Sequence, residues 1–204
     1  YPGIPGLNLT YEVREGIIKH DTVYDSPSCD PRFHPEECPT LESQVCDASD
    51  QVAYNNADLD DALKMGLLDV EELREVEWAW ELFQRAQSEL GLPLRDKFVK
   101  YRAIGRMYDE YVQDVLEETR RRMEAAGVRT LEDVRRCGLR LVEFSEEFRG
   151  RMRPLQEFLL RRVYKSPSLV RMATKAEKFI VEMFTLYYEH PGQLPWKYQR
   201  RIEK

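Results

Sequence analysis

The stretch from Gln44 to Asp61, read as a helix, constrains this chain more than any other part of it. Apolar residues recur along it at steps of three, four and seven, a spacing typical of a helix face that packs on a core. These residues are Leu41, Val45, Ala48, Val52, Leu59 and Leu63. A different face repeats polar residues at steps of four. Its members are Asp50, Tyr54 and Asp58, flanked by Asp47 and Asp61.

Acidic side chains stacked on one helical face repel one another unless something complementary lies in front of them. A divalent metal ion, the hydroxyl groups of a sugar, or a row of Arg and Lys side chains would each be complementary. The alternative is a solvated acidic face, which is the usual interpretation of a charged helical stripe. The pattern alone leaves both interpretations open.

The segment QVCDASDQVAYNNADLDDALKMGLL resembles the final motif of the bacterial deoxyguanosine triphosphate triphosphohydrolases, the dGTPase branch of the HD phosphohydrolases. The matching positions are Glu42, Gln44, Val45, Asp47, Asp50, Val52, Tyr54, Asp58, Leu59, Asp60, Asp61, Leu63 and Gly66. The resemblance implies that Asp50 is the last of the family's four ligands for a divalent metal ion such as Mg or Mn. It also implies that Tyr54 and Asp58 hold the deoxyribose of a deoxynucleoside triphosphate.

Three further segments resemble the same family, so that the resemblance covers roughly residues 6–195. They are LNLTYEVREGIIKH, YRAIGRMYDEYVQDVLEET, and the run that begins LVEFSEEFRGRM and ends LVRMATKA. In the second, the resemblance implies that Arg102 is offered to the triphosphate, with Arg106 as second choice; an ordinary solvated cation is the equal alternative. The implied fold is all-α, the later portion of a multi-helix HD-domain-like bundle. Residues 1–66 would then end the catalytic core, and residues 67–204 would form a helical region packed on it.

Composition fits a soluble helical protein: of 204 residues, 42% are hydrophobic and 33% are charged. No run of about 18 apolar residues occurs, so we expect no membrane span. Residues 1–90 carry 6 Lys and Arg against 20 Asp and Glu, whereas residues 91–204 carry 25 against 17. Such an asymmetry suits either a metal and polyphosphate site or two helical layers that attract each other.

Capping signals set the expected helix limits. A helix capped by Asn8 or Thr10 is expected to bury Leu9, Val13, Ile17 and Ile18. The central helix is expected between a cap at Thr40 and a stop at Gly66. A capping box at Asp69 and Glu72 opens a helix to Gly91, with one side formed by Leu73, Val76, Trp80 and Phe83.

The later helices follow the same rules. A long helix from Arg95 to about Ala126 has an apolar set of Phe98, Ile104, Met107, Tyr108, Tyr111, Val112, Val115 and Leu116. A short helix is expected from Thr130, another after Ser145 with a kink or fresh start at Pro154, and a last one from Pro167. The last is expected to bury Leu169, Met172, Ala176, Phe179, Ile180, Met183, Phe184 and Tyr187.

The cysteine and histidine pattern favours a reducing, cytoplasmic setting. Four cysteines lie without the spacing of a disulfide framework. Cys29, His34 and Cys38 share a Pro-rich loop within residues 21–40, but a zinc site there would need a borrowed ligand. His20, near the end of the first helix, is more typical of a side chain that compensates the helix dipole than of a catalytic group.

Asp50 alone cannot hold a metal, because a hydrolytic metal needs four or more ligands besides water. The family's other ligands, a His and a His-Asp pair, lie upstream of the segments matched here, and the chain opens at Tyr1, so we expect it to be a fragment. The leading hypothesis is part of a metal-dependent enzyme that splits deoxynucleoside triphosphates into deoxynucleoside and triphosphate, inactive as this stretch alone. The alternative is a non-catalytic helical module for nucleotides or single-stranded nucleic acid. A homo-oligomer is expected in either case.

Overall fold

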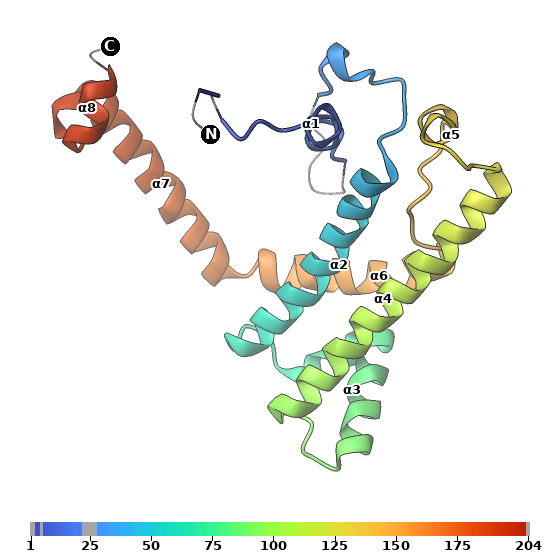
Figure 1. The fold of residues 1–204 in the computed structure, drawn as a ribbon. Helices are drawn as coiled ribbons and strands as arrows, with labels where there is room; N and C mark the ends of the chain where they lie inside the picture. Colours follow the sequence, from blue (N-terminus) through green and yellow to red (C-terminus); the bar gives the residue numbers. More distant parts are fainter. Residues whose placement is uncertain (1–2, 5, 22–27, 203–204) are drawn as a thin grey trace. The chain divides into compact units, whose positions relative to one another are not determined.

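A computed structural model describes residues 3–4, 6–21 and 28–202 of the chain. Over these residues every regular element is a helix (Figure 1). The all-α, HD-domain-like bundle predicted from the sequence is therefore confirmed. None of the described helices combines the length and the apolar composition that a membrane crossing requires.

The chain divides into two compact units, Tyr1–Phe158 and Leu159–Lys204, each described here by itself. The first unit contains α1 (Tyr11–Ile18), η1 (Pro31–Phe33), α2 (Leu41–Lys64), η2 (Val70–Glu75), α3 (Glu77–Leu90), α4 (Lys97–Ala126), α5 (Leu131–Arg136) and nearly all of α6 (Glu146–Leu159). The second contains η3 (Leu160–Tyr164), α7 (Pro167–Glu189), η4 (Pro191–Gln193) and α8 (Trp196–Ile202). The division after Phe158 is based on contacts between residues. The boundary predicted after residue 66 concerns the end of a catalytic core, and it stays a prediction.

The predicted caps are found at most helix ends. Thr40 accepts a hydrogen bond from the Ser43 N–H and begins α2. Gly66, with φ +68°, follows its end, and the Leu67 N–H closes the turn on the Ala62 carbonyl at 2.9 Å. The Asp69 and Glu72 capping box is present, but it opens the short 3₁₀ helix η2, because Val76 is extended and interrupts the helix before α3.

The core of the first unit lies where α4 packs on α3 and α2 and where α6 adds aromatic side chains (Figure 1). Tyr111 is the centre of this cluster, edge-to-face with Trp78, Phe144 and Phe148 at centroid distances of 5.2–5.8 Å. Trp78, not Trp80, is the buried tryptophan, because the interruption at Val76 shifts the phase of α3. The Trp78 indole donates to Glu110 at 2.6 Å, so its polar edge is satisfied.

The predicted buried face of α1 is wrong. The side chains of Leu9, just before the helix, and of Val13 and Ile17 are exposed, whereas Glu15 is fully buried. The reason is a long-range pair: Arg135 of α5 binds both oxygens of Glu15 at 2.7 and 2.8 Å and turns that face inward.

The predicted apolar set of α4 is confirmed in part. Ile104, Met107 and Tyr111 are buried, together with the small residues Val99 and Ala103. The side chains of Phe98, Tyr108, Val112 and Leu116 are exposed.

The later helices keep their predicted starts. The Ser145 hydroxyl accepts the Phe148 N–H at 3.1 Å, and α6 then continues through Pro154 without the predicted fresh start. Ser166 caps α7, with Pro167 at its first position. Contrary to the prediction, none of the residues of α7 is buried. Within the predicted loop 21–40, residues 22–27 lie outside the described part of the chain, and residues 31–33 form η1.

Candidate functional site

The acidic face of α2 is the starting point of the candidate site. Asp50 and Tyr54 lie partly in solvent, with 39% of the Asp50 side chain and 46% of Tyr54 exposed. Asp58, one turn further on, is half-buried. On the opposite side, Ala48 and Leu59 pack into the core. The two predicted faces are therefore found in part: Val45 of the apolar stripe is exposed and Asp47 of the polar face is buried, while Asp50 and Tyr54 are accessible.

His20 joins this face from the end of α1. Its Nδ1 lies 2.6 Å from Oδ1 of Asp47, and its Nε2 lies 4.0 Å from Oδ2 of Asp50. The residue that caps α1 is Lys19, so the interpretation of His20 as a dipole-compensating side chain gives way to a contact with α2. One imidazole thus lies between two carboxylates that are one helical turn apart.

Arg140 completes the cluster from the loop after α5. Its guanidinium binds Oδ2 of Asp47, and it also donates to the main-chain oxygen of Asp21 at 3.0 Å. Asp47 is only 3% exposed, and a carboxylate at that depth needs charged or hydrogen-bonding partners. Because His20 and Arg140 occupy both of its oxygens, Asp47 is a positioning residue and Asp50 is the acid that remains accessible.

Gln44 fixes the loop that carries Arg140. Its buried side-chain oxygen accepts the N–H groups of Leu141 and Val142 at 2.7 and 3.1 Å, and its amide donates to the Pro39 oxygen at 2.8 Å. Arg122 of α4 donates to the Arg140 main-chain oxygen at 3.0 Å. Hydrogen bonds from α2 and α4 therefore hold the backbone from the Arg140 carbonyl to Val142 in place.

Two cavities border this cluster within the first unit. One, of about 820 Å³, lies between α1 and α2 and is lined by His20, Cys46 and Asp47 among others. The other, of about 600 Å³, is more polar and is lined by Gln51 together with Arg140, Arg149 and Arg153. Asp21, Glu143 and Glu146 line this second cavity as well, and Arg149 pairs with Glu143 at 2.8 Å, so its lining carries both signs of charge.

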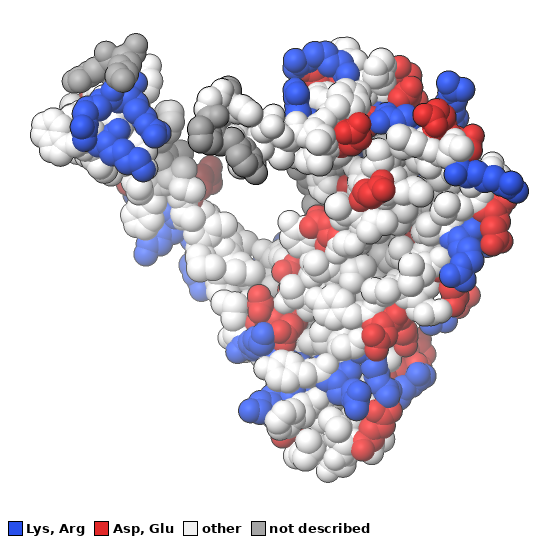
Figure 2. All heavy atoms as spheres, in the orientation of Figure 1, with Lys and Arg blue, Asp and Glu red and all other residues white. Residues whose placement is uncertain are grey.

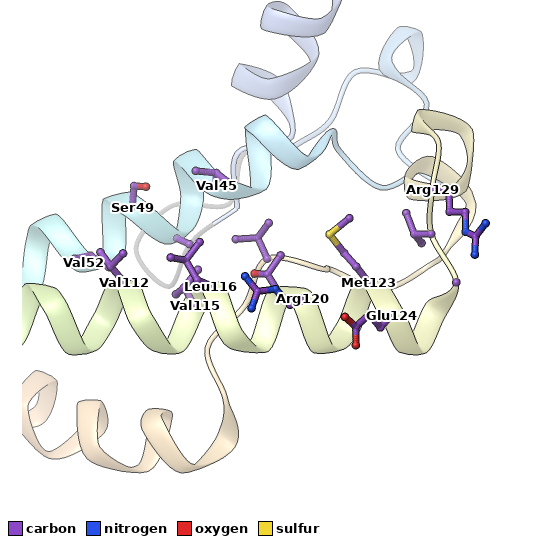
Figure 3. Close-up of a pocket in the computed structure, with 15 residues that line it drawn as sticks. Val45, Ser49, Val52, Val112, Val115, Leu116, Arg120, Met123, Glu124 and Arg129 are labelled. Atoms are coloured by element: carbon purple, nitrogen blue, oxygen red, sulfur yellow. The ribbon is translucent and has the colours of Figure 1, made fainter.

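A third cavity of about 700 Å³ is a groove between α2 and α4 (Figure 3). Figure 3 shows Val45 and Val52 on α2 facing Val112 and Leu116 on α4. Its lining is mainly aliphatic, so it lacks the convergent polar groups that a nucleotide phosphate requires. The polar chemistry of the first unit lies instead around Asp47 and Asp50.

The structure places the predicted arginine on α4. Arg102 is exposed, and within the described residues it has no ion pair. Arg106, the second choice, is bound to Glu89 of α3. Lys100 of the same helix binds Asp60 of α2 at 2.8 Å, which ties α4 to the helix that carries the acidic face. Of the two predicted arginines, Arg102 is thus the one that stays accessible.

A complete metal centre is absent from the described part of the chain, where no group of three His, Cys, Asp or Glu side chains is arranged to hold a metal ion. Asp50 has an imidazole 4.0 Å away, and the oxygens of Asp47 are occupied by His20 and Arg140. A catalytic divalent ion needs more ligands than that. The residues present therefore do not fit a complete metal site, and Asp50 could supply one ligand of it.

The suggested zinc ligands do not gather either. The Cys29 thiol points to the Asp30 oxygen at 3.7 Å, and His34 lies 3.3 Å from Glu36. Cys38 lies beside Cys137 instead. The three side chains therefore have different neighbours and do not converge on one point.

Comparison with known proteins identifies a matching family and several similar proteins. Residues 142–204 match the phosphohydrolase-associated domain. The whole chain is 39% identical to a deoxyguanosinetriphosphate triphosphohydrolase-like protein of Geobacter sulfurreducens, and covers 53% of it. Proteins of the same description from Ralstonia nicotianae and Leptospira interrogans are 36% and 30% identical over 98% and 100% of the chain. The chain spans about half the length of these curated relatives.

These findings define the chain first as a relative of phosphohydrolases. Within that class, its resemblance to the dGTPase family is confirmed over its whole length by relatives described as dGTPase-like.

Sequence reasoning missed His20, Asp47 and Arg140 as one group. Asp47 was seen only as a flank of the acidic face, and His20 was assigned to its own helix. Nothing in the spacing relates Arg140 to Asp47, since they are far apart in the chain. The spacing contains no signal for this group, because Asp47 falls on the same helix face as Asp50, and only its burial in the structure demands charged partners.

Proposed function

We propose that this chain is part of a metal-dependent deoxynucleoside triphosphate triphosphohydrolase, which converts a deoxynucleoside triphosphate and water into a deoxynucleoside and inorganic triphosphate. The observation that carries the proposal is the accessible series Asp50, Tyr54 and Asp58 on α2, in a chain whose relatives are described as dGTPase-like. Other phosphohydrolase chemistry on a different nucleotide would use the same face, and the substrate panel below separates the two.

Each residue has a proposed role. Asp50 is one ligand of a divalent ion such as Mg or Mn, and the remaining ligands lie outside the described residues. Tyr54 and Asp58 hydrogen-bond the sugar, where a hydroxyl donor and a carboxylate acceptor suit the 3′-OH. Arg102 is a candidate for the triphosphate, because an accessible guanidinium binds phosphate oxygens bidentately.

His20, Asp47 and Arg140 are proposed to position Asp50. Asp47 binds the guanidinium of Arg140 and lies 2.6 Å from Nδ1 of His20, which orients the His20 ring with its Nε2 toward Asp50. A ring held in this way limits the rotamers open to Asp50. We also propose a cytoplasmic homo-oligomer whose substrates are deoxynucleoside triphosphates.

The test is triphosphate release from each of the four deoxynucleoside triphosphates and their ribose counterparts by the complete gene product. Asp50→Asn is expected to lower turnover by at least about 100-fold, because loss of a charged ligand removes metal affinity. Asp61→Asn is the matched control: Asp61 lies on the same helix, is exposed and pairs with Lys64 at 3.9 Å. Undiminished turnover in Asp50→Asn would remove Asp50 from the site.

A second candidate function is a non-catalytic module that binds nucleotides or single-stranded nucleic acid. It is favoured by the absence of a three-ligand cluster among the described residues and by the basic C-terminal helix α8, with Lys197, Arg200 and Arg201. Figure 2 shows basic side chains gathered around that helix. Binding of a labelled oligonucleotide that weakens steeply with salt, in a protein that releases no triphosphate, would favour this function.

A further inference from the structure

Two cysteines that are distant in the sequence meet at one turn. Cys38 lies just before the cap of α2, and Cys137 ends α5. The Cys38 N–H donates to the Arg135 oxygen at 3.0 Å, so the two backbones run within hydrogen-bonding distance. Both thiols point at the same acceptor, the Leu139 oxygen, at 3.6 Å from Cys38 and 3.0 Å from Cys137.

The two thiols also influence each other electrostatically, and the Cys38 thiol is approached by the N–H of Gly138. Gly138 has φ +65°, a left-handed conformation that lets the turn fold tightly around the sulfur. A disulfide needs closely spaced backbones with side chains directed toward one another. Here a backbone hydrogen bond joins the two segments, and both thiols are directed at one carbonyl oxygen.

We propose that Cys38 and Cys137 form a reversible disulfide. With glutathione disulfide as the oxidant, one cysteine thiolate attacks it and releases one glutathione thiolate. The second cysteine thiolate then attacks the protein sulfur of the mixed disulfide and releases the other. Two protein thiols lose two electrons and two protons, and one glutathione disulfide becomes two glutathione thiols.

The surroundings favour this pair over the other cysteines. Both thiols are partly exposed, so a small oxidant can reach them. Cys46 is exposed on α2, and the Cys29 thiol points at the Asp30 oxygen.

The bond would act on the candidate site through the loop after α5. Cys137 lies three residues before Arg140, whose guanidinium holds Asp47. Cys38 lies two residues before Thr40, the cap of α2. A covalent link between these two points would therefore fix the start of the acidic helix to the loop that positions its buried carboxylate.

The experiment equilibrates the purified protein in glutathione buffers from fully reduced to fully oxidised, blocks free thiols and identifies the peptides by mass spectrometry. We expect one linked peptide pair, Cys38 with Cys137, that dithiothreitol reverses, while Cys29 and Cys46 stay alkylated. Cys137→Ser should abolish the link, and the matched control Cys46→Ser should retain it. Alkylation of Cys38 and Cys137 throughout, or glutathione adducts in place of the link, would overturn the proposal.

A second readout uses the unsubstituted protein, so it does not depend on any variant folding. Closing a loop of about 100 residues restricts the unfolded chain, and the oxidised form should melt higher, on the order of 10 °C. Cys38→Ser should remove the difference between oxidised and reduced samples. Equal melting temperatures in the unsubstituted protein would contradict the disulfide. Neither measurement requires turnover, so failure here is distinct from failure of the proposed enzymatic function.

Discussion

Two acidic residues one turn apart on α2 have opposite surroundings, and we therefore propose different roles for them. Asp47 is buried, and its oxygens are held by His20 and Arg140. Asp50 is more than a third exposed and touches only the far edge of the His20 ring. A buried carboxylate is committed to its partners, whereas an accessible one can exchange water for a ligand. The same residue type therefore has a positioning role at 47 and a proposed binding role at 50.

Tyr54 gives a prediction at this scale about sugar selection. Tyr54→Phe keeps the ring and removes the hydroxyl, so a lost bond to the deoxyribose should lower kcat/KM for deoxynucleoside triphosphates by roughly tenfold. Tyr108→Phe, which removes an exposed phenol of α4, is the control. Steady-state triphosphate release by the complete gene product is the measurement. A kcat/KM that Tyr54→Phe leaves unchanged would remove the hydroxyl from sugar recognition.

Glu118 gives a second prediction, on acid sensitivity. Arg121 and Arg122 bind it at 2.7 Å, and the Arg121 hydrogen bond is the main cause that lowers the Glu118 pKa to about 2. Glu118→Gln should reduce the free energy of unfolding by about 1–2 kcal/mol at pH 7. Because the folded pKa is depressed, the ionised group stabilises the fold above pH 4.5, and this contribution is lost as pH falls towards 2.

Urea unfolding at several pH values checks this. The difference between the unsubstituted protein and Glu118→Gln should be constant from pH 7 to 5 and shrink below pH 4.5. A difference that grows on acidification would show that the two arginines do not hold Glu118 as a carboxylate. Glu117→Gln, on the neighbouring exposed position of α4, serves as the matched control.

At the scale of elements, local signals determined where helices begin and end, and long-range pairs determined which faces are buried. Thr40, Thr130 and Ser166 are caps because a side-chain oxygen meets an N–H three residues on, a relation visible in sequence. The face of α1 could not be predicted in this way. Its inward direction depends on Arg135, which is 120 residues from Glu15. The apolar spacing of α1 does not predict its buried face, because the ion pairs of Glu15 stabilise a different orientation of the helix.

The ion pairs of Glu15 give a prediction about the free energy of unfolding. Glu15 is fully buried and holds Lys19 at 2.9 Å and Arg135 at 2.7 Å. Glu15→Gln removes the carboxylate partner of Lys19 and leaves Arg135 with Glu37 alone, at 3.2 Å. It should therefore cost about 3 kcal/mol of unfolding free energy, within the range for breaking a buried pair. Glu12→Gln on the exposed side of α1 should cost less than about 0.5 kcal/mol.

Chemical unfolding of both variants measures this, with limited proteolysis as a local probe. Cleavage within α1 should accelerate in Glu15→Gln and stay unchanged in Glu12→Gln. Equal stabilities of the two variants would mean that contacts with α2, and not the ion pairs of Glu15, attach α1.

Across the first unit, the charge asymmetry of the sequence is used to join elements. Acids from the first 90 residues pair with cations from later ones, as in Glu15 with Arg135, Asp47 with Arg140 and Asp60 with Lys100. On the face shown in Figure 2, acidic and basic side chains lie intermixed over this unit. Of the two interpretations of the asymmetry, attraction between helical layers is thus realised in these pairs. A metal and polyphosphate role for the remaining charges belongs to the proposed function.

This use of charge predicts how the whole fold responds to acid. Burial opposes ionisation of Glu15 and Asp60, but hydrogen bonds from Arg135 and Lys19 to Glu15, and from Lys100 and Lys64 to Asp60, lower both pKa values. Groups whose folded pKa lies below the unfolded value stabilise the protein above that unfolded value, 4.5 for Glu15 and 3.8 for Asp60. Their contribution disappears as pH falls and the unfolded chain takes up protons first.

The free energy of unfolding should therefore be level from pH 7 to 5 and decline steadily below about pH 4.5. Urea titrations across that range measure it, and the decline should be shallower in Glu15→Gln but unaltered in Glu12→Gln. A stability that stays level down to pH 3 would mean that these carboxylates do not join the helices of the first unit through their charge.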